Sequence, residues 1–364
     1  MKYKLMTPGP TQVRENVRLA RSLECTNPDL DEEFVEFYKE TCLLISRLLH
    51  TKNEAFILDG EGILGLEAAC ASLTEPQDKV LVLDNGIYGK GFGDFVTMYG
   101  GQVTYYTTDY DKAIDPVELR RFLEQNHDFK YATLVHCDTP SGMLNPVEEL
   151  SRLLHEYGIM TVVDSVSAMF GEPLDVDNGQ IDIVCGGSQK ALSAPPGLTF
   201  VTVSPKALEC MEKRKTPIAS FYANILVFKN YYEEKWFPYT MPISDIYGLR
   251  QALENVADDK DIYARHEKLA QYTREELQKM GLRIYGKDGF SNTVSVFYVP
   301  DGFSADEILH AMRQDYGIMI AGSFDVFAGK LLRIGHMGEN ANEGDVRNTL
   351  QALKEIIDKK SHIL

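Results

Sequence analysis

The sequence lacks cysteines at the spacing of a disulfide framework or a metal site. Its six cysteines include no CxxC pair, and no group of Cys and His has the spacing of metal ligands. Cys137 and Cys185 lie within apolar runs, which favours buried, reduced thiols over disulfides. We therefore expect a protein of the reducing cytoplasm that holds no metal.

Positive charge and long apolar runs are also scarce. The 37 Lys and Arg residues are outnumbered by 54 Asp and Glu residues, and the formal net charge is −17. This charge repels phosphate backbones and anionic lipids, so neither nucleic acid nor a membrane surface is expected as a partner. No run approaches the roughly 20 apolar residues of a membrane span, and Met1–Pro10 lacks the apolar stretch of a signal peptide.

What the sequence contains is a repeated alternation of strand and helix patterns. Short apolar runs, several of them apolar on both faces, are separated by amphipathic stretches such as Pro146–Tyr157. This alternation predicts an α/β fold with a mostly parallel, doubly wound sheet. The predicted strands are Ala55–Leu58, Lys79–Asp84, Val103–Tyr106, Tyr131–His136, Met160–Asp164, Ile181–Gly186 and Thr199–Val203.

Changes in this pattern along the chain predict two domains. A long amphipathic helix, Leu30–Leu49, precedes the strands, residues 205–280 are mainly helical, and an α+β pattern begins at Gly281. We predict an N-terminal arm lining the active site (1–25), a large α/β domain (26–258), a linking helix (259–280) and a small C-terminal α+β domain (281–364), with the site in the cleft between domains. The small domain is predicted to contain strands Arg283–Tyr285, Asn292–Tyr298, Ile318–Ile320 and Leu331–Gly335 and helices Ala305–Tyr316 and Glu343–Lys359.

Two residues that follow predicted strands could carry chemistry. Ligands of doubly wound sheets bind at the carboxyl ends of the strands, where Asp164 follows "TVV" and Lys190 follows "CGGSQ". A buried lysine has a lowered pKa and can form a Schiff base with an aldehyde. An aspartate opposite a pyridine nitrogen keeps that nitrogen protonated and makes the ring an electron sink. Each signal alone is weak, because a strand-end Asp is more often a helix cap and a loop lysine is usually solvated.

Taken together, several motifs resemble those of the class V aminotransferases, particularly the alanine–glyoxylate and serine–pyruvate branch. They run nearly end to end and include "TPGPTQV", "HCDTPSGMLNP", "VVDSVSAMFGEP", "GSQKALSAPPG" and "KLLRIGHMG". The resemblance implies a fold type I enzyme with a large aminotransferase-type domain and a small C-terminal domain. It also implies pyridoxal 5'-phosphate as cofactor and a homodimer with shared active sites.

The resemblance implies a role for each matched position. Lys190 matches the Schiff-base lysine, which also carries the proton between the substrate α-carbon and the cofactor. Asp164 matches the partner of the pyridinium nitrogen, and Val166 matches the apolar residue under the ring. Tyr88 matches a stacking aromatic residue, and Thr139 matches a residue that hydrogen-bonds the ring hydroxyl. The implied contacts near the phosphate are Gln189, Gly60, Glu61, Gly62, Ile63, Phe237 and Thr240, of which Thr240 reaches across from the partner subunit.

The resemblance also implies a binding site for the substrate carboxylate. Arg333 matches the arginine that grips this group, for which a guanidinium offers a two-pronged hydrogen-bonding fork. Its strand is expected to be buried, and a buried arginine needs an anion, although a structural salt bridge stays open as the alternative. Pro8 and Gly9, in the rigid Thr7–Pro10 loop, are expected to line the substrate pocket.

Four positions depart from the family pattern. Glu61 and Ile63, in "LDGEGILGLEAA", stand where phosphate-binding hydroxyls are common. Phe237 replaces a tyrosine, and Gly91 stands where many members carry an arginine. A carboxylate beside a phosphate is unfavourable. Glu61 could turn outward, become protonated, or cap the helix itself and weaken cofactor binding. We expect the cofactor to bind even so, through Lys190, Asp164, the residues Gln189 and Thr240, and backbone amides.

The predicted reaction moves an amino group from a small amino acid of the alanine or serine type to glyoxylate or pyruvate. A 2-aminoethylphosphonate–pyruvate or a ureidoglycine–glyoxylate transaminase is an alternative. A cysteine desulfurase is disfavoured, because no cysteine follows Cys210. The changes at Glu61, Ile63 and Phe237 motivate a further alternative, a non-catalytic paralogue with a weakened phosphate cup.

Overall fold

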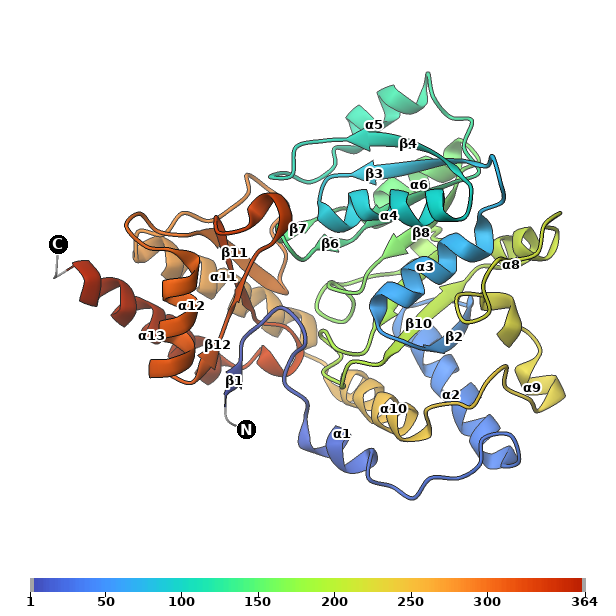
Figure 1. Ribbon diagram of the computed structural model, residues 1–364, viewed down its shortest axis with the longest axis horizontal. Helices are drawn as coiled ribbons and strands as arrows, with labels where there is room; N and C mark the ends of the chain where they lie inside the picture. The colour runs from blue at the N-terminus through green and yellow to red at the C-terminus, as the bar shows by residue number, and fades with distance from the viewer. Residues whose placement is uncertain (1–2, 362–364) are drawn as a thin grey trace.

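The computed structural model of the chain describes residues 3–361 and contains a seven-stranded sheet in its larger part (Figure 1). Strands β9, β8, β5, β3 and β4 run parallel, and β10 runs antiparallel to its neighbours β9 and β2. This sheet confirms the predicted α/β class, and each of its strands overlaps a predicted one. In spatial order the strands are β2 (Glu54–Asp59), β10 (Leu198–Val203), β9 (Ile183–Gly187), β8 (Met160–Asp164), β5 (Tyr131–Val135), β3 (Lys79–Asp84) and β4 (Gln102–Thr107).

Apolar side chains on both faces place the central strands of the sheet in the interior, whereas the edge strand β4 is partly exposed. Every residue of β5, β8, β9 and β10 is buried, as expected for a sheet with helices on both sides. Helices α3 and α4 pack against each other and against the sheet (Figure 1). The helices of this part are α1 (Glu15–Ala20), α2 (Glu32–Leu48), α3 (Gly62–Leu73), α4 (Ile87–Met98), α5 (Pro116–Leu123), α6 (Val147–Glu156), α7 (Val176–Gly179), α8 (Pro205–Glu212), η1 (Ile225–Phe228), α9 (Tyr231–Glu234) and α10 (Ile243–Asp258).

A smaller sheet and three helices form a second hydrophobic core in the C-terminal part of the chain. This arrangement has the α+β character that was predicted, while the domain boundaries stay a prediction. No helix within residues 3–361 combines the length and apolar character needed to cross a membrane. In sheet order, the strands of this part are β11 (Val294–Tyr298), β14 (Leu331–Gly335) and β13 (Ala321–Gly322). Its helices are α11 (Ile262–Lys279), α12 (Ala305–Asp315), η2 (Asp325–Phe327), η3 (Gly338–Asn340) and α13 (Glu343–Ser361). A hairpin of β6 (Cys137–Asp138) and β7 (Met143–Leu144) belongs to the large part.

The predicted strand at Arg283–Tyr285 is wrong. Only Ile284 pairs there, in an isolated bridge with Phe297. Gly281 and Gly286 flank the segment with φ angles of 79° and 102°. Residues with positive φ turn the chain, so the extended run between them is too short to form a ladder.

The N-terminal arm connects the two cores, which the sequence did not reveal. Strand β1 (Lys4–Leu5) pairs in parallel with β12 (Ile318–Met319), and Met6 is fully buried in the second core. A few residues later, the backbone N–H of Thr11 donates to the backbone oxygen of Gln189 at 3.1 Å. The intervening loop therefore lies between the small sheet and the large one.

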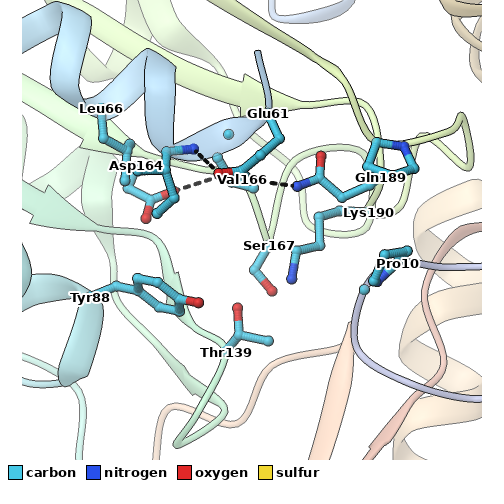
Figure 2. Close-up of a pocket in the computed structure, with 14 residues that line it drawn as sticks. Pro10, Glu61, Leu66, Tyr88, Thr139, Asp164, Val166, Ser167, Gln189 and Lys190 are labelled. Atoms are coloured by element: carbon cyan, nitrogen blue, oxygen red, sulfur yellow. Dashed lines mark hydrogen bonds between the residues drawn. The ribbon is translucent and has the colours of Figure 1, made fainter.

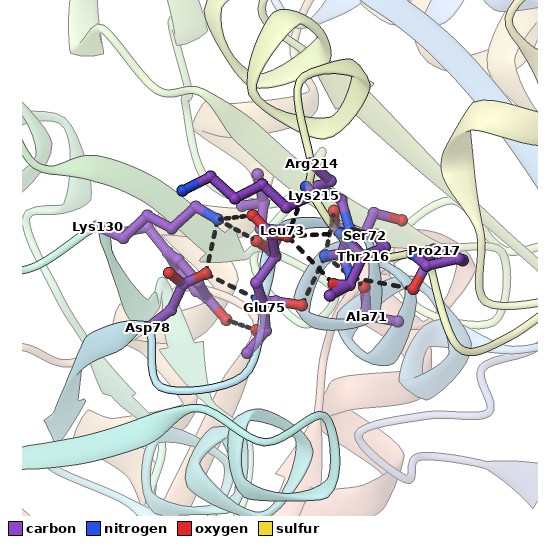
Figure 3. Close-up of polar contacts among 12 residues, drawn as sticks. Ala71, Ser72, Leu73, Glu75, Asp78, Lys130, Arg214, Lys215, Thr216 and Pro217 are labelled. Atoms are coloured by element: carbon purple, nitrogen blue, oxygen red, sulfur yellow. Dashed lines mark hydrogen bonds and ion pairs between the residues drawn. The ribbon is translucent and has the colours of Figure 1, made fainter.

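Cationic side chains hold the C-terminal end of helix α3 (Figure 3). Arg214 Nη1 donates to the backbone oxygens of Ser72 at 3.1 Å and Thr74 at 2.5 Å. Lys130 Nζ donates to the backbone oxygen of Leu73 at 2.8 Å. Cations stabilise this end of a helix, because its last carbonyl groups have no partner within the helix and carry the negative end of the dipole. The opposite end of α3 follows β2 and reaches the carboxyl edge of the sheet.

Replacing Arg214 by alanine is expected to lower the free energy of unfolding by about 1–3 kcal/mol, because several carbonyl groups lose a charged donor. Urea unfolding followed by circular dichroism measures this change. Lys213→Ala is the matched control, since Lys213 is exposed and bonds only Glu209 of its own helix. Equal unfolding midpoints for the two variants would contradict the anchoring role of Arg214.

Candidate active site

A cavity of about 320 Å³ opens where β8 and β9 end (Figure 2). Its walls come from the N-terminal arm, the first turns of α3 and α4, and the loops after β6, β8 and β9. This is the carboxyl edge of the parallel strands, where ligands bind in doubly wound folds. The lining residues are Gly9, Pro10, Glu61, Gly62, Ile63, Leu66, Tyr88, Thr139, Asp164, Val166, Ser167, Gln189, Lys190 and Pro196.

Lys190 enters this cavity from the turn after β9. Its Nζ donates to the backbone oxygen of Pro8 at 2.6 Å. Gly9 has a φ of 100°, and a Cβ at this position would lie 2.5 Å from Lys190 Cδ. Burial lowers the pKa of Lys190 to about 8, and the charge of Arg333 acts in the same direction. A larger share of this lysine than of an ordinary one is therefore the neutral amine near physiological pH, which is the form that attacks a carbonyl carbon.

Asp164 ends β8 and lies across the cavity from Lys190 in Figure 2. Its Oδ1 accepts a hydrogen bond from the backbone N–H of Val166 at 2.9 Å. Burial raises the pKa of Asp164 to about 7, and the carboxylates of Asp138 and Glu61 add to this effect. No helix begins directly after Asp164, so the common role of a helix cap does not apply. Such a carboxyl group suits a ligand that brings a protonated nitrogen to it.

The walls between these two groups are formed by Tyr88, Thr139 and Val166. Asp138 positions Tyr88, because its Oδ1 accepts a hydrogen bond from the backbone N–H of Tyr88 at 2.9 Å. Sequence reasoning missed Asp138, although its place at the end of a strand was the available signal. It also missed Ser167, whose buried hydroxyl has no hydrogen-bond partner among the described residues.

Glu61 caps helix α3 with its own side chain. Its Oε1 accepts from the backbone N–H of Ile63 at 3.1 Å, and its Oε2 accepts from Gln189 Nε2 at 2.9 Å (Figure 2). Of the three arrangements open at the sequence level, the structure shows the cap. The other polar atom of the amide, Gln189 Oε1, is buried without a hydrogen-bond partner among the described residues.

Arg333, on β14, lies next to the cavity wall. Its guanidinium donates to the backbone oxygens of Gly322 at 2.6 and 3.0 Å and of Thr139 at 3.3 Å. The residue is 8% exposed, and burial lowers its pKa. No Asp or Glu among residues 3–361 forms an ion pair with it, so the structural salt bridge left open by the sequence is absent there. Two of the five guanidinium N–H groups stay available to an anion.

Three residues expected near the cofactor, Phe237, Thr240 and Gly60, do not line the cavity. Phe237 is 1% exposed, and its ring packs in the core of its own chain, with centroids 5.0 Å from Tyr38 and 5.5 Å from Tyr231. Its assignment to the cofactor site stays a prediction, and here the ring is enclosed by the core of its own chain. Thr240 is exposed, and its reach across a dimer stays a prediction. Gly60 adjoins the cavity without lining it.

A pyridoxal ring fits one end of the cavity, and a phosphate group does not fit the other. The ring end offers the Lys190 amine, the Asp164 carboxyl group and the side chains that line the walls between them. At the start of α3, the Ile63 N–H and one N–H of the Gln189 amide already donate to Glu61, whose carboxylate stands where a phosphate would bind. The residues therefore agree with the predicted cofactor for its ring and disagree for its phosphate.

Comparison with known proteins gives consistent matches. The family model of aminotransferase class-V matches residues 18–325. The pyridoxamine–pyruvate transaminase of Mesorhizobium japonicum is 33% identical over 86% of this chain and 81% of its own length. The alanine–glyoxylate aminotransferase of Callithrix jacchus is 31% identical over 97% of this chain and 87% of its own length. The crystal structure of ureidoglycine–glyoxylate aminotransferase from Bacillus subtilis matches with a TM-score of 0.95 at 27% identity, covering 99% of this chain and 94% of that one.

Proposed function

Because the chain belongs to the class V aminotransferases, we propose that it moves an amino group from a small amino acid of the alanine or serine type to glyoxylate or pyruvate. Enzymes of this class depend in general on pyridoxal phosphate. The observation that carries the proposal is that one cavity contains both Lys190 and the buried Asp164. The presence of Lys190, Asp164 and Arg333 together favours an active enzyme over a non-catalytic paralogue.

The residues of the cavity have separate roles in this reaction. When bound, the pyridoxal group supplies an electron sink for the charge left when the α-proton departs. Asp164 keeps the proton on the ring nitrogen, and Tyr88 and Val166 enclose the ring. Lys190 removes the α-proton and returns it at the neighbouring carbon. Gly9 and Pro10 cover the lysine from the arm side and limit the access of water.

Arg333 is proposed to bind the substrate carboxylate with its two free N–H groups. Arg333→Leu is expected to raise KM for the 2-oxo acid by at least about tenfold, since a charge-assisted pair of hydrogen bonds is lost. Amino transfer between alanine or serine and glyoxylate or pyruvate, followed by amino-acid analysis, measures this change and tests the function itself. Absence of transfer for every donor–acceptor pair in the wild-type protein would contradict the proposed function.

The control separates carboxylate binding from a general defect. With pyridoxamine, which has no carboxylate, as the donor, Arg333→Leu should react with acetaldehyde, which lacks the carboxylate of pyruvate, as fast as the wild-type protein does. Arg333→Lys keeps the charge without the fork and should recover little of the loss in KM. An equal loss with acetaldehyde and pyruvate would assign Arg333 a purely structural role.

A second candidate reaction uses pyridoxamine as the amino donor, as in the name of the Mesorhizobium relative. The observation that favours it is the carboxylate of Glu61 at the start of α3. In this reaction the aminomethyl carbon of pyridoxamine is oxidised to an aldehyde by two electrons. The 2-oxo carbon of pyruvate is reduced by the same two electrons and takes the amino group, while its oxygen ends on the aldehyde.

We further propose that the protein works as a homodimer in the cytoplasm. Exposed aromatic residues support the dimer: Phe221, Tyr222 and Trp236 are 57%, 50% and 59% exposed. They lie in the segment that precedes Thr240, the residue expected to reach the partner subunit. The six cysteines are unpaired, which suits a reducing compartment.

A further inference from the structure

We propose that the pair formed by Glu61 and Gln189 is a specificity-determining subsite that accepts a neutral hydroxymethyl group and rejects a phosphate. The ring ligand of this cavity is then unphosphorylated, as in pyridoxal and pyridoxamine. This inference rests on the proposed function, because it assumes that the ring lies between Lys190 and Asp164. It concerns only the substituent that points to the start of α3.

Glu61 engages hydrogen-bond donors that a phosphate would need. A helix N-terminus binds a phosphate through free backbone N–H groups. At the start of α3, the N–H of Ile63 donates to Glu61 Oε1, and the amide of Gln189 donates to Glu61 Oε2. The side chain of Glu61 thus provides the negative charge that a phosphate would provide, from within the chain.

Within residues 3–361, the hydrogen-bonding group that stays without a partner beside Glu61 is an acceptor, Gln189 Oε1. Gln189 Oε1 is buried, has no partner among the described residues and belongs to a residue that lines the cavity. The orientation of the amide is determined by Glu61, because the reverse orientation would place Oε1 against a carboxylate. An unpaired acceptor next to a carboxylate requires a donor. A hydroxymethyl group has an O–H to donate, whereas a phosphate dianion has none.

The electrostatics of this subsite also disfavour a phosphate. Among the described residues, Glu61 forms no ion pair with a Lys or Arg side chain that would offset its charge. On α4, Gly91 stands where many members of the family carry an arginine, and a Cβ there would meet no atom within 4 Å. A phosphate dianion would therefore lie beside a carboxylate that no cation pairs with directly, which is repulsive in a partly dehydrated site.

Equilibrium binding tests this inference without relying on turnover. The full chain, freed of bound ligand, is titrated by calorimetry with pyridoxamine and with pyridoxamine 5'-phosphate. Neither compound has an aldehyde that could react with Lys190. We expect the wild-type protein to bind pyridoxamine at least about tenfold more tightly than its phosphate ester. Glu61→Ser is expected to reverse this preference, because serine still caps α3 and leaves the Gln189 amide free.

Two further variants separate charge from shape. Glu61→Gln keeps the size of the side chain and should lose most of the preference. Asp59→Asn removes an equal charge two residues away, outside the cavity lining, and should keep the wild-type preference. Thermal unfolding of each variant establishes that it is folded.

The outcomes distinguish this inference from the proposed function. Equal affinities of the wild-type protein for both compounds, or a preference unchanged in Glu61→Ser, would overturn the hydroxymethyl subsite and leave the aminotransferase proposal intact. If the folded wild-type protein binds neither compound, the ring site itself is wrong and both proposals fail. Tighter binding of the phosphate ester would restore pyridoxal phosphate as the resident cofactor.

Discussion

Replacing Lys190 by alanine is expected to lower the rate of amino transfer by about 10³-fold, because the reaction loses the group that moves the α-proton. The side chain is held in position for this proton transfer, since its Nζ donates to the backbone oxygen of Pro8 and the missing Cβ of Gly9 leaves it the space that it occupies. Single-turnover kinetics with each amino donor measures the loss. Lys190→Arg is the matched control, since it keeps the positive charge and should be equally slow.

The pH dependence of Lys190 gives the same prediction a second readout. Burial lowers the pKa of its ammonium group to about 8, so the neutral amine predominates above pH 8 and becomes scarcer below it. The rate at which Lys190 reacts with an aldehyde should rise about tenfold per pH unit up to pH 8 and then level off. A rate that continues to rise toward pH 10 would show that Lys190 has an ordinary pKa and that burial does not lower it.

Replacing Asp164 by asparagine is expected to lower turnover by about 10²–10³-fold, because a neutral amide cannot keep the proton on the ring nitrogen. Steady-state kinetics at saturating ligand measures this effect. Asp84→Asn is the matched control, since Asp84 is also buried at the end of a strand but bonds Tyr110 and Thr107 outside the cavity. Equal losses in the two variants would remove Asp164 from the reaction.

Stability should change in the opposite direction from activity in Asp164→Asn. Burial raises the pKa of Asp164 from 3.8 to about 7, so folding favours its protonated form. The stability that protonation provides is fully present below pH 4 and is lost as the pH rises through 7. Asparagine resembles the protonated form at every pH. The variant should therefore unfold at a higher urea concentration than the wild-type protein at pH 8, and at a similar one near pH 4.

Much of the fold followed from local pattern. Most strands of the large sheet could be placed because a strand buried on both faces appears as a short apolar run between turn residues. Asp164 and Lys190 were found for a related reason. Strand ends can be read from the sequence, and the ends of parallel strands meet at one edge of a sheet.

The errors arose where a local pattern was interrupted or where a side chain had a distant partner. The strand expected at Arg283–Tyr285 fails because glycines turn the chain on both sides of it. The contacts of Phe237, a residue assigned to the cofactor by its place in a motif, are with rings distant in the sequence, which no local pattern predicts. Asp138 was missed because its partner, the backbone N–H of Tyr88, lies 50 residues away.

The sequence by itself determined the α/β class, the strands of the large sheet, the class V resemblance and the identity of Lys190 and Asp164. Only the tertiary structure decided what Glu61 does. Its carboxylate bonds an amide 128 residues away, and hydrogen-bond partners at such separations are brought together by the packing of sheet and helix. The same holds for the N-terminal arm, which reaches Lys190 because β1 pairs with β12 at the other end of the chain.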